Sequence, residues 1–366
     1  MLQTDERELR LIEYFENKGF KSDNVNGFKV ITEYGSVVDE VESLYRGVGL
    51  RNASHFGIIE LKGKDVMDFL HRISTNSIKD LPKEGVRNTL FISEKGRIIG
   101  LTTLLNFEDY QLLFCDRHSK PFVLAWLKKY VIADDVQVND ANGKYNLLEL
   151  RGPQADSFVT MICGNVVNDM KPDSFKIIHF ENLLFFLAKI TDERGHNKFW
   201  MLGDFENAKR LIEYMQENKG PFNFNLVGEN AFNIYRVEMG IPAAPGELNS
   251  DYNPHEAGLI DYIDFNKGCY IGQEVIARLQ TYDKVQRQLT GVRFSNQDIT
   301  GEQLSIYNGG EEIGKITSTV NSVKFNELIG LAYVKKGFLN YKEQLIAKNG
   351  KGNAQNISLN SLPFTK

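Results

Sequence analysis

The sequence has 366 residues, of which 42% are hydrophobic and 25% are charged, a mixture typical of globular proteins. This length exceeds that of one ordinary hydrophobic core and predicts two or three domains. The formal net charge of −5 gives no general attraction to nucleic acids or anionic membranes, so neither is an expected partner.

The first segment, residues 1–18, is charged and amphipathic and lacks the continuous apolar core of a signal peptide. No apolar run approaches the roughly 20 residues that are needed to cross a bilayer. The three cysteines, Cys115, Cys163 and Cys269, are odd in number and widely spaced, which is not the pattern of a disulfide framework. We therefore expect a cytoplasmic protein with reduced thiols and no membrane association.

Helical and strand patterns alternate up to about residue 285. Apolar residues recur with helical spacing in three segments: 66–73, 120–131 and 205–215. Two apolar runs, 98–105 and 110–114, flank the turn-like segment 106–109 and predict a β-hairpin. Further strands are expected at 145–150 and 183–190. The pattern predicts an α+β fold in which helices cover antiparallel sheets.

After Gln286 the pattern changes to short β-rich runs separated by turn residues such as Asn308-Gly309-Gly310. The expected strands are 289–294, 303–307, 313–318, 328–334 and 344–347. No long helical pattern lies among them. We expect a separate antiparallel β-barrel or sandwich of about 80 residues.

Residues 233–242 predict the end of a helix, because Gly240 suits the position after the last turn and Pro242 follows it. Glu238 would lie in that last turn, where a carboxylate is mildly unfavourable, so a partner such as Arg236 or a ligand is expected. A carboxylate can accept two parallel hydrogen bonds from the N–H groups of a pterin ring. The alternative is a surface acid without a ligand.

Residues 265–278 predict a loop at Asn266-Lys267-Gly268 followed by a helix with Ile271, Val275 and Leu279 on one face. Cys269 would lie near the start of that helix, where the helix dipole and Lys267 would lower the pKa of its thiol. Three structural alternatives remain open for this segment. In the first, Cys269 is a small side chain that fills space in the core. In the second, Gln273 and Glu274 form the polar face of the helix, and in the third, Arg278 pairs with Glu274 on the surface.

These two segments carry a family resemblance. The octapeptide Lys267-Gly268-Cys269-Tyr270-Ile271-Gly272-Gln273-Glu274 resembles the K-G-C-Y-x-G-Q-E signature of YgfZ-type proteins, a branch of the folate-binding glycine-cleavage T-protein (GcvT) superfamily. The segment from Arg236 to Pro242 is similar to the R-x-E-x-G-x-P element that precedes it in that family. Weaker similarities extend the resemblance over nearly the whole chain from about Arg51.

The resemblance implies a three-domain, cloverleaf-like fold with tetrahydrofolate in a central channel. The expected domains are 1–50 with 145–250, then 51–144, a signature-motif connector at 251–285, and a C-terminal antiparallel β-barrel at 286–366. It implies that Glu238 contacts the pterin and makes Cys269 the candidate functional thiol. Arg236, Tyr270 and Arg278 are further candidate folate contacts. Proteins of this branch support the assembly or repair of iron–sulfur enzymes. The expected function is therefore that of a tetrahydrofolate-binding accessory protein for iron–sulfur cluster assembly or repair, with such enzymes or assembly factors as partners besides reduced folate.

One departure separates this chain from glycine-cleavage aminomethyltransferases. Those enzymes carry an Asp-Asp pair where this sequence has Gly100 and Leu101. Transfer of an aminomethyl carbon to folate needs an acid, base or electrostatic group near the folate nitrogens, so conventional activity is not expected. An aminomethyltransferase remains the alternative function, and a non-catalytic folate or protein-binding module is the third.

No metal site is expected. Three scattered cysteines cannot supply the usual four ligands of an iron–sulfur cluster. The six histidines lack the paired spacing of zinc-binding helices, and no G-x-G-x-x-G follows a strand.

Overall fold

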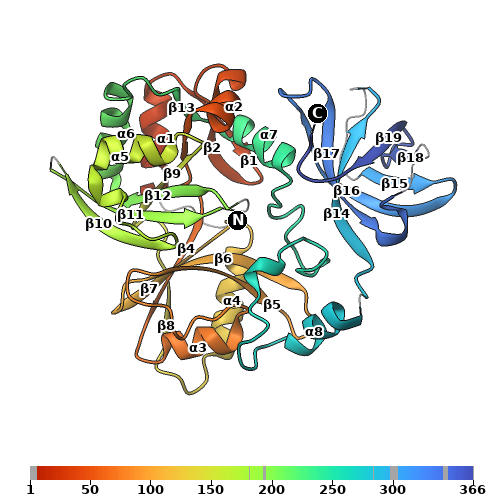
Figure 1. Ribbon diagram of the computed structural model, residues 1–366, viewed down its shortest axis with the longest axis horizontal. Helices are drawn as coiled ribbons and strands as arrows, with labels where there is room; N and C mark the ends of the chain where they lie inside the picture. Colours follow the sequence, from red (N-terminus) through yellow and green to blue (C-terminus); the bar gives the residue numbers. More distant parts are fainter. Residues whose placement is uncertain are drawn as a thin grey trace. The chain divides into compact units, whose positions relative to one another are not determined.

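The computed structural model describes residues 6–180, 182–192, 195–282, 284–296, 304–340 and 345–365 (Figure 1). The chain divides into two compact units, each of which is described by itself. Unit 1 comprises Met1–Leu70, Ile78–Asn88 and Thr102–Phe232, and unit 2 comprises His71–Ser77, Thr89–Leu101 and Asn233–Lys366.

Unit 1 contains a six-stranded sheet in the order β10-β11-β12-β9-β3-β13. The strands are β10 (Ser174–Phe180), β11 (Leu183–Thr191), β12 (Asn197–Gly203), β9 (Asn146–Arg151), β3 (Val48–Asn52) and β13 (Phe224–Val227). Neighbours are antiparallel except β13 and β3, which run parallel. The strands predicted at 145–150 and 183–190 are therefore confirmed as β9 and β11.

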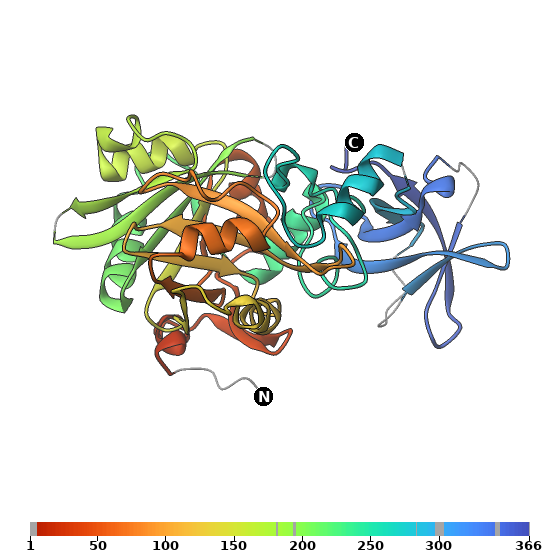
Figure 2. The same ribbon diagram turned by 90° about the horizontal axis from the view of Figure 1, so that it is seen from below.

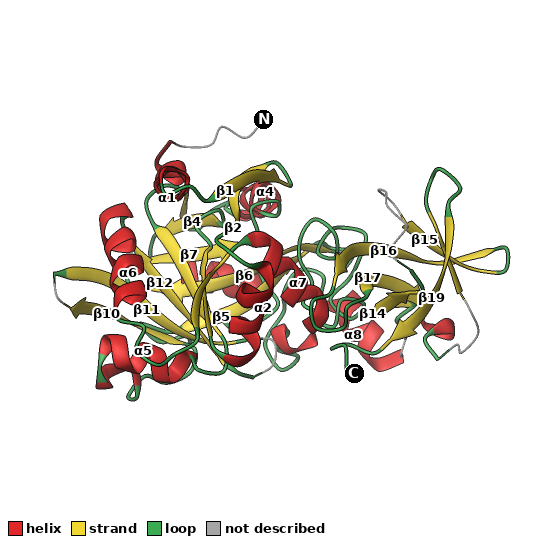
Figure 3. Ribbon diagram, turned by 90° about the horizontal axis from the view of Figure 1, so that it is seen from above, coloured by secondary structure: helices red, strands yellow, loops and turns green. Residues whose placement is uncertain are grey.

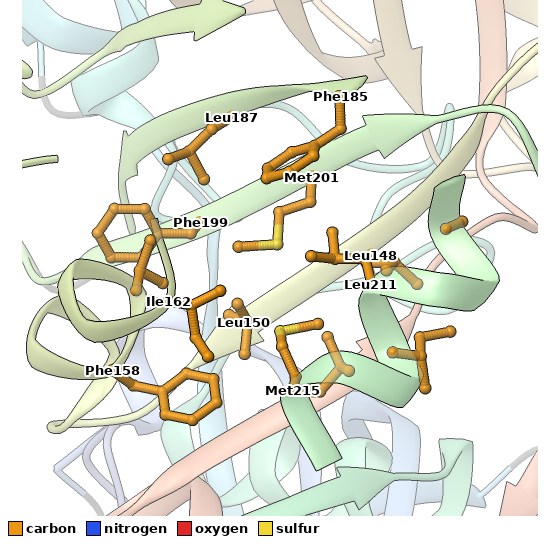
Figure 4. Packing of buried hydrophobic residues seen from close by; sticks show 14 of the residues in the cluster. Leu148, Leu150, Phe158, Ile162, Phe185, Leu187, Phe199, Met201, Leu211 and Met215 are labelled. Atoms are coloured by element: carbon orange, nitrogen blue, oxygen red, sulfur yellow. The ribbon is translucent and has the colours of Figure 1, made fainter. Parts of the chain in front are cut away.

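One face of this sheet carries the main core of unit 1. Helices α1 (Glu6–Asn17), α5 (Ala155–Cys163) and α6 (Phe205–Glu217) contribute apolar side chains to it. Figure 4 shows Leu148, Leu150, Phe199 and Met201 from the strands against Met215 of α6. Ser36 caps the N-terminus of helix α2 (Val37–Arg46), because its Oγ accepts a hydrogen bond from the backbone N–H of Asp39. A hairpin of β1 (Lys21–Val25) and β2 (Phe28–Glu33) precedes this helix.

A second sheet has the order β5-β6-β7-β4-β8. Its strands are β4 (Gly57–Lys62), β5 (Val86–Ile92), β6 (Ile98–Asn106), β7 (Tyr110–Cys115) and β8 (Gln137–Asp140). β6 and β7 pair as the predicted hairpin. The three predicted helices are confirmed as α3 (Val66–Ile73), α4 (Lys120–Tyr130) and α6. A short helix, η1 (Asn165–Val167), follows α5.

Unit 2 ends in a closed barrel in the order β14-β17-β16-β15-β18-β19, drawn in blue in Figure 2. The strands are β14 (Arg287–Phe294), β15 (Leu304–Asn308), β16 (Glu311–Asn321), β17 (Leu328–Lys335), β18 (Leu345–Lys348) and β19 (Ala354–Asn360). The barrel, one of the two predicted forms, is therefore confirmed. β19 was not predicted, because polar residues interrupt its apolar alternation, and Gln303 and Gln344, the predicted ends of two strands, lie outside the described residues.

Three helical segments precede the barrel: α7 (Glu229–Met239), η2 (Ile260–Tyr262) and α8 (Gln273–Tyr282); η3 (Lys336–Phe338) follows β17. α7 ends at Gly240, which has a φ of +71° as the predicted helix stop requires. Across the described residues the fold is α+β with antiparallel sheets and a C-terminal barrel, as predicted. The three-domain boundaries stay a prediction.

Among the described helices, none combines the length and apolar character that crossing a membrane requires.

Candidate functional site

The signature segment forms a loop in unit 2, and Cys269 is exposed on it. The sequence placed Cys269 near the start of a helix, but α8 begins only at Gln273. Gly272 has a φ of +82°, which no α-helix contains, so the helix cannot extend back through it to Cys269. Cys269 therefore lies four residues before the first residue of α8.

Gly272 is required by a close contact. A Cβ at this position would lie 2.5 Å from the carbonyl oxygen of Ser93, in the turn between β5 and β6. We expect Gly272→Ala to lower the free energy of unfolding by about 1–3 kcal/mol, through this overlap and the positive φ. Gly268→Ala is the matched control, because nothing lies within 4 Å of its added Cβ. Urea denaturation checks both, and equal effects would contradict the explanation.

Lys267 is buried and its Nζ donates three hydrogen bonds, at 2.6, 2.8 and 2.7 Å, to the carbonyl oxygens of His71, Ser74 and Asn76. These carbonyls belong to the end of α3 and the turn after it, where a helix leaves acceptors unsatisfied. Burial lowers the pKa of Lys267 to about 8. The ammonium group thus anchors the loop to the α3 terminus, and its hydrogen bonds go to these carbonyls rather than to Cys269.

The remaining signature residues divide between the interior and the surface. Tyr270 is buried, its ring centroid lies 5.3 Å from Nζ of Lys267, and burial raises the pKa of its hydroxyl to about 12. Gln273 is half-buried and Glu274 is exposed. Arg278 pairs with Glu274 at 2.6 Å, and both side chains are more than two-thirds exposed. The surface pair of Arg278 with Glu274 is therefore present, and the folate role of Arg278 stays a prediction.

Glu238 and Arg236, on the last turns of α7, are held by other parts of unit 2. Oε1 of Glu238 accepts hydrogen bonds from the hydroxyl of Ser322 at 2.6 Å and from the backbone N–H of Lys324 at 3.2 Å. The residue is only 1% exposed. It is not the surface acid of the alternative reading, and its buried contacts favour a structural role.

Arg236 donates to Oε2 of Glu247 at 3.1 Å and to Oγ of Ser318 at 2.9 Å. Glu247 in turn accepts from the hydroxyl of Ser318 at 2.7 Å and from the backbone N–H of Ala243 at 3.0 Å. These bonds join α7 and the segment after it to the barrel strand β16. The carboxylate partner of Arg236 is therefore Glu247 and not Glu238, the partner that the sequence suggested.

A third segment, from Asn253 to Glu256, contacts both α8 and the turn between β5 and β6. Nε2 of His255 lies 3.2 Å from the carbonyl oxygen of Ile276 in α8, and burial lowers the pKa of this imidazole. Glu256 accepts from the backbone N–H of Asn253 at 3.0 Å and from Arg97 at 3.4 Å. Arg97 follows the turn that Gly272 contacts, so these bonds fix the β5–β6 turn and α8 in one framework within unit 2.

In β6, Gly100 is buried and Leu101 is half-buried, and neither residue has a carboxylate. Asp109 is exposed in the turn after β6. The departure from the aminomethyltransferase pattern therefore stands in the structure as it does in the sequence.

Sequence reasoning missed a cluster of buried charges in unit 1, here called the charged cluster: Arg51, Glu149, Arg151, Asp192 and Glu229. Their neighbours Leu50, Leu148 and Leu150 belong to the main core, so by strand alternation the charges of β3 and β9 lie on the opposite sheet face. The available signal was the alternation of Glu149 and Arg151 with leucines in an otherwise apolar strand.

Arg51 lies at the centre of this cluster. Its Nε and Nη2 donate to the two carboxylate oxygens of Glu229 at 2.7 and 2.8 Å, and its guanidinium lies 3.6 Å from the ring centroid of Phe232. Glu149 accepts from Nε of Arg151 at 3.1 Å and from the indole N–H of Trp200 at 2.8 Å. Burial acts to raise the pKa of Glu149, but Arg151, Lys198 and Arg51 lower it to about 2.

Within the described residues, no group of three or more histidine, cysteine, aspartate or glutamate side chains is placed to hold a metal ion. Cys115 is buried, Cys163 is half-buried and only Cys269 is exposed, so the three thiols differ in access to reagents and partners.

Comparison with known proteins adds family information. The model of the GCVT N-terminal domain matches residues 11–267, and the model of the glycine cleavage T-protein C-terminal barrel domain matches residues 287–366. An aminomethyltransferase of Bacillus licheniformis is 25% identical over 328 residues, covering 89% of this chain and 90% of the relative. An aminomethyltransferase of Bacillus mycoides is 27% identical and covers 88% of each chain.

A putative chloroplastic transferase of Arabidopsis thaliana is 26% identical over 310 residues, covering 84% of this chain and 70% of the relative. The crystal structure of a glycine cleavage system aminomethyltransferase T from Bartonella henselae superposes with a TM-score of 0.83 at 21% identity, covering 100% of this chain and 98% of that one. This structural likeness shows the shared fold.

Proposed function

We propose that this chain, which belongs to the glycine cleavage T-protein family, is a folate-dependent one-carbon transferase of the aminomethyltransferase type. The observation that carries the proposal is the agreement of both domain models with relatives named aminomethyltransferase that align over about nine-tenths of their length and of this chain. Tetrahydrofolate is the proposed acceptor of the carbon unit.

The framework of unit 2 supports folate binding only in part. The carboxylate of Glu238 would have to exchange the Ser322 hydroxyl for the N–H groups of a pterin, because Oε1 is already bonded. Arg236 already donates hydrogen bonds to Glu247 and Ser318, and Arg278 already forms an ion pair with Glu274. Tyr270 is buried beside Lys267. The predicted folate roles of these four residues therefore remain proposals that a titration must separate from structural roles.

The folate role of Glu238 has a direct test. We expect tetrahydrofolate to bind the wild-type protein saturably in a calorimetric titration. Glu238→Gln keeps the size of the side chain and removes its charge. If Glu238 binds the pterin, the affinity should fall at least about tenfold, which corresponds to 1.4 kcal/mol. Affinity equal to wild type in a folded variant would assign Glu238 a structural role. Glu311→Gln is the matched control, since this glutamate is 59% exposed, pairs with Lys335 and is not one of the candidate folate contacts.

The reaction itself is tested at Gly100. Methylene-tetrahydrofolate formation from a lipoyl carrier protein loaded with the aminomethyl group is expected to be slow in the wild type, because no carboxylate stands at this position. Gly100→Asp introduces one where the family's aminomethyltransferases carry it, and we expect at least about a tenfold increase in rate. Gly100→Ala controls for the added Cβ. Equal rates in folded Asp and Ala variants would contradict the proposed chemistry.

A second candidate function rests on Cys269, the exposed cysteine of the signature loop. In the YgfZ-type branch that the loop resembles, the expected role is support of iron–sulfur enzymes through this thiol. In cells that lack the native protein, Cys269→Ser would then fail to restore iron–sulfur enzyme activities, while Cys163→Ser would restore them. Full restoration by Cys269→Ser would remove this candidate and leave folate transfer or non-catalytic folate binding.

A further inference from the structure

The outer edge of β10 in unit 1 is only half covered. β10 is an end strand of its sheet (Figure 3). At its beginning, the N–H of Phe175 donates to the carbonyl of Glu84 and the N–H of Val86 donates to the carbonyl of Asp173, both at 2.8 Å. Over residues 176–180, no strand among the described residues pairs with the outer side.

The free part of this edge offers hydrogen-bonding groups in a regular array. The N–H of Phe175 points outward, and backbone groups alternate direction along a strand, so those of Ile177 and His179 also point outward. A strand with unpaired outward groups is a template for another strand.

Apolar side chains adjoin the free edge on one face of the β10–β11 hairpin. Ile177 is 60% exposed and Leu184 is 54% exposed. In the register of the hairpin, Ile177 faces Phe186 and His179 faces Leu184, so these four side chains share one face. Lys176 is the one charged residue of β10, and it lies on the other face. This face of the edge therefore carries two exposed apolar side chains together with the exposed His179.

We propose that this edge of β10 pairs with the same edge of a second copy of this chain, antiparallel, about a two-fold axis at Ile178. The free stretch runs from the residue after Phe175, whose N–H is already bonded, to the end of β10 at Phe180, and Ile178 is its centre. Any other centre would press the second copy against Glu84 or leave outward groups unpaired. A two-fold interface of this kind is self-complementary.

In this register Ile177 of each copy faces His179 of the other. Each such pair exchanges two N–H···O bonds, so the two pairs supply four backbone hydrogen bonds across the axis. On this face the two Ile177 side chains lie diagonally across the axis from each other, and His179 of each copy lies between Leu184 of its own copy and Ile177 of the other. Lys176 faces Phe180 of the second copy, so the two like charges are not opposite each other.

The interface is one strand wide, which places it among the small, weak interfaces, and we expect a dissociation constant on the order of 10–100 μM. Sedimentation velocity of the full-length protein should show a dimer forming over this concentration range. Ile177→Lys should raise the dissociation constant at least about tenfold, because it puts two like charges diagonally across the two-fold axis from each other. Val38→Lys, at another exposed apolar residue, should leave the constant unchanged.

The register has its own test. Because residue 177 faces residue 179 of the other copy, the double variant Ile177→Lys/His179→Glu places opposite charges together twice and should recover the dimer. Ile177→Lys/His179→Lys should remain monomeric. Both sites are exposed, so the variants should fold, as circular dichroism checks. A wild type that is monomeric at 200 μM, on the order of several times the expected constant, would overturn the proposal. Failure of the Lys/Glu pair to restore the dimer would overturn the register.

Discussion

Replacing Arg51 with methionine is expected to lower the free energy of unfolding by about 3–5 kcal/mol, the usual cost of removing one partner from a buried ion pair. Arg51 makes a two-bond contact with Glu229, at 2.7 and 2.8 Å, and lies 4.0 Å from Glu149. Its loss leaves the Glu229 carboxylate without its guanidinium partner in a largely buried site, where an unpaired charge is costly.

Urea denaturation of matched variants measures this effect. Arg278→Met removes an arginine from a pair that is more than two-thirds exposed, so a change within about 0.5 kcal/mol is expected there. The double variant Arg51→Met/Glu229→Leu should recover part of the loss, because no unpaired charge then remains. An Arg51→Met protein as stable as the Arg278→Met control would show that the charged cluster carries no net electrostatic energy.

The same cluster predicts sensitivity to acid. The pKa of Glu149 in the folded protein is about 2, below its ordinary value of 4.5, so its contribution to stability is complete above pH 4.5 and is lost as the pH falls towards 2. Burial lowers the pKa of the neighbouring His55 from 6.5 to about 4, so folding opposes its protonation. Stability should therefore fall as the pH drops from 6.5, and thermal melts from pH 7 to pH 3 will show it. His55→Gln should reduce the slope between pH 6.5 and 4, and His255, whose pKa burial also lowers, should supply the part that remains.

Periodic patterns along the chain were sufficient for much of the fold. Val66, Phe69, Leu70 and Ile73 follow helical spacing and do form α3, because these side chains are buried on one face. The barrel was visible as short apolar runs between turn residues. β19 escaped because only every second residue of Ala354–Asn360 faces inward, and those that do include a glutamine.

The candidate site was harder to predict, because its interactions are distant in the sequence. Lys267 finds its acceptors almost 200 residues earlier in the chain, and Glu238 finds Ser322 84 residues later. No local pattern encodes such pairs. The sequence could show that these residues were unusual for their positions, as Glu238 is in the last turn of a helix, but only packing within unit 2 reveals that Ser322 and the backbone of Lys324 are its partners.

The helix start was misjudged for a local reason that a sequence pattern alone hides. Ile271 shares helical spacing with Val275 and Leu279, yet Gly272 between them takes a left-handed conformation. Glycine can adopt either the helical or the left-handed conformation, so its presence does not predict which one forms. In the structure the carbonyl of Ser93 lies so close to Gly272 that no Cβ would fit there. The thiol of Cys269 consequently lies on a loop, and its chemistry depends on how that loop is anchored.

Lys267 is that anchor, and we expect Lys267→Met to lower the free energy of unfolding by about 2–4 kcal/mol. The methionine preserves the apolar stem and leaves the carbonyl oxygens of His71, Ser74 and Asn76 without their charged donor, at about 1–3 kcal/mol for each one that water cannot reach. Amide exchange should accelerate at the end of α3 and in residues 265–272, and alkylation of Cys269 should change in rate. Lys335→Met, at a lysine that is about half exposed, is the control. Lys267→Met could instead prove as stable as this control, with amide exchange at wild-type rates. In that case Lys267 would stabilise neither the loop nor the end of α3, and its role would lie in contact with a ligand or partner.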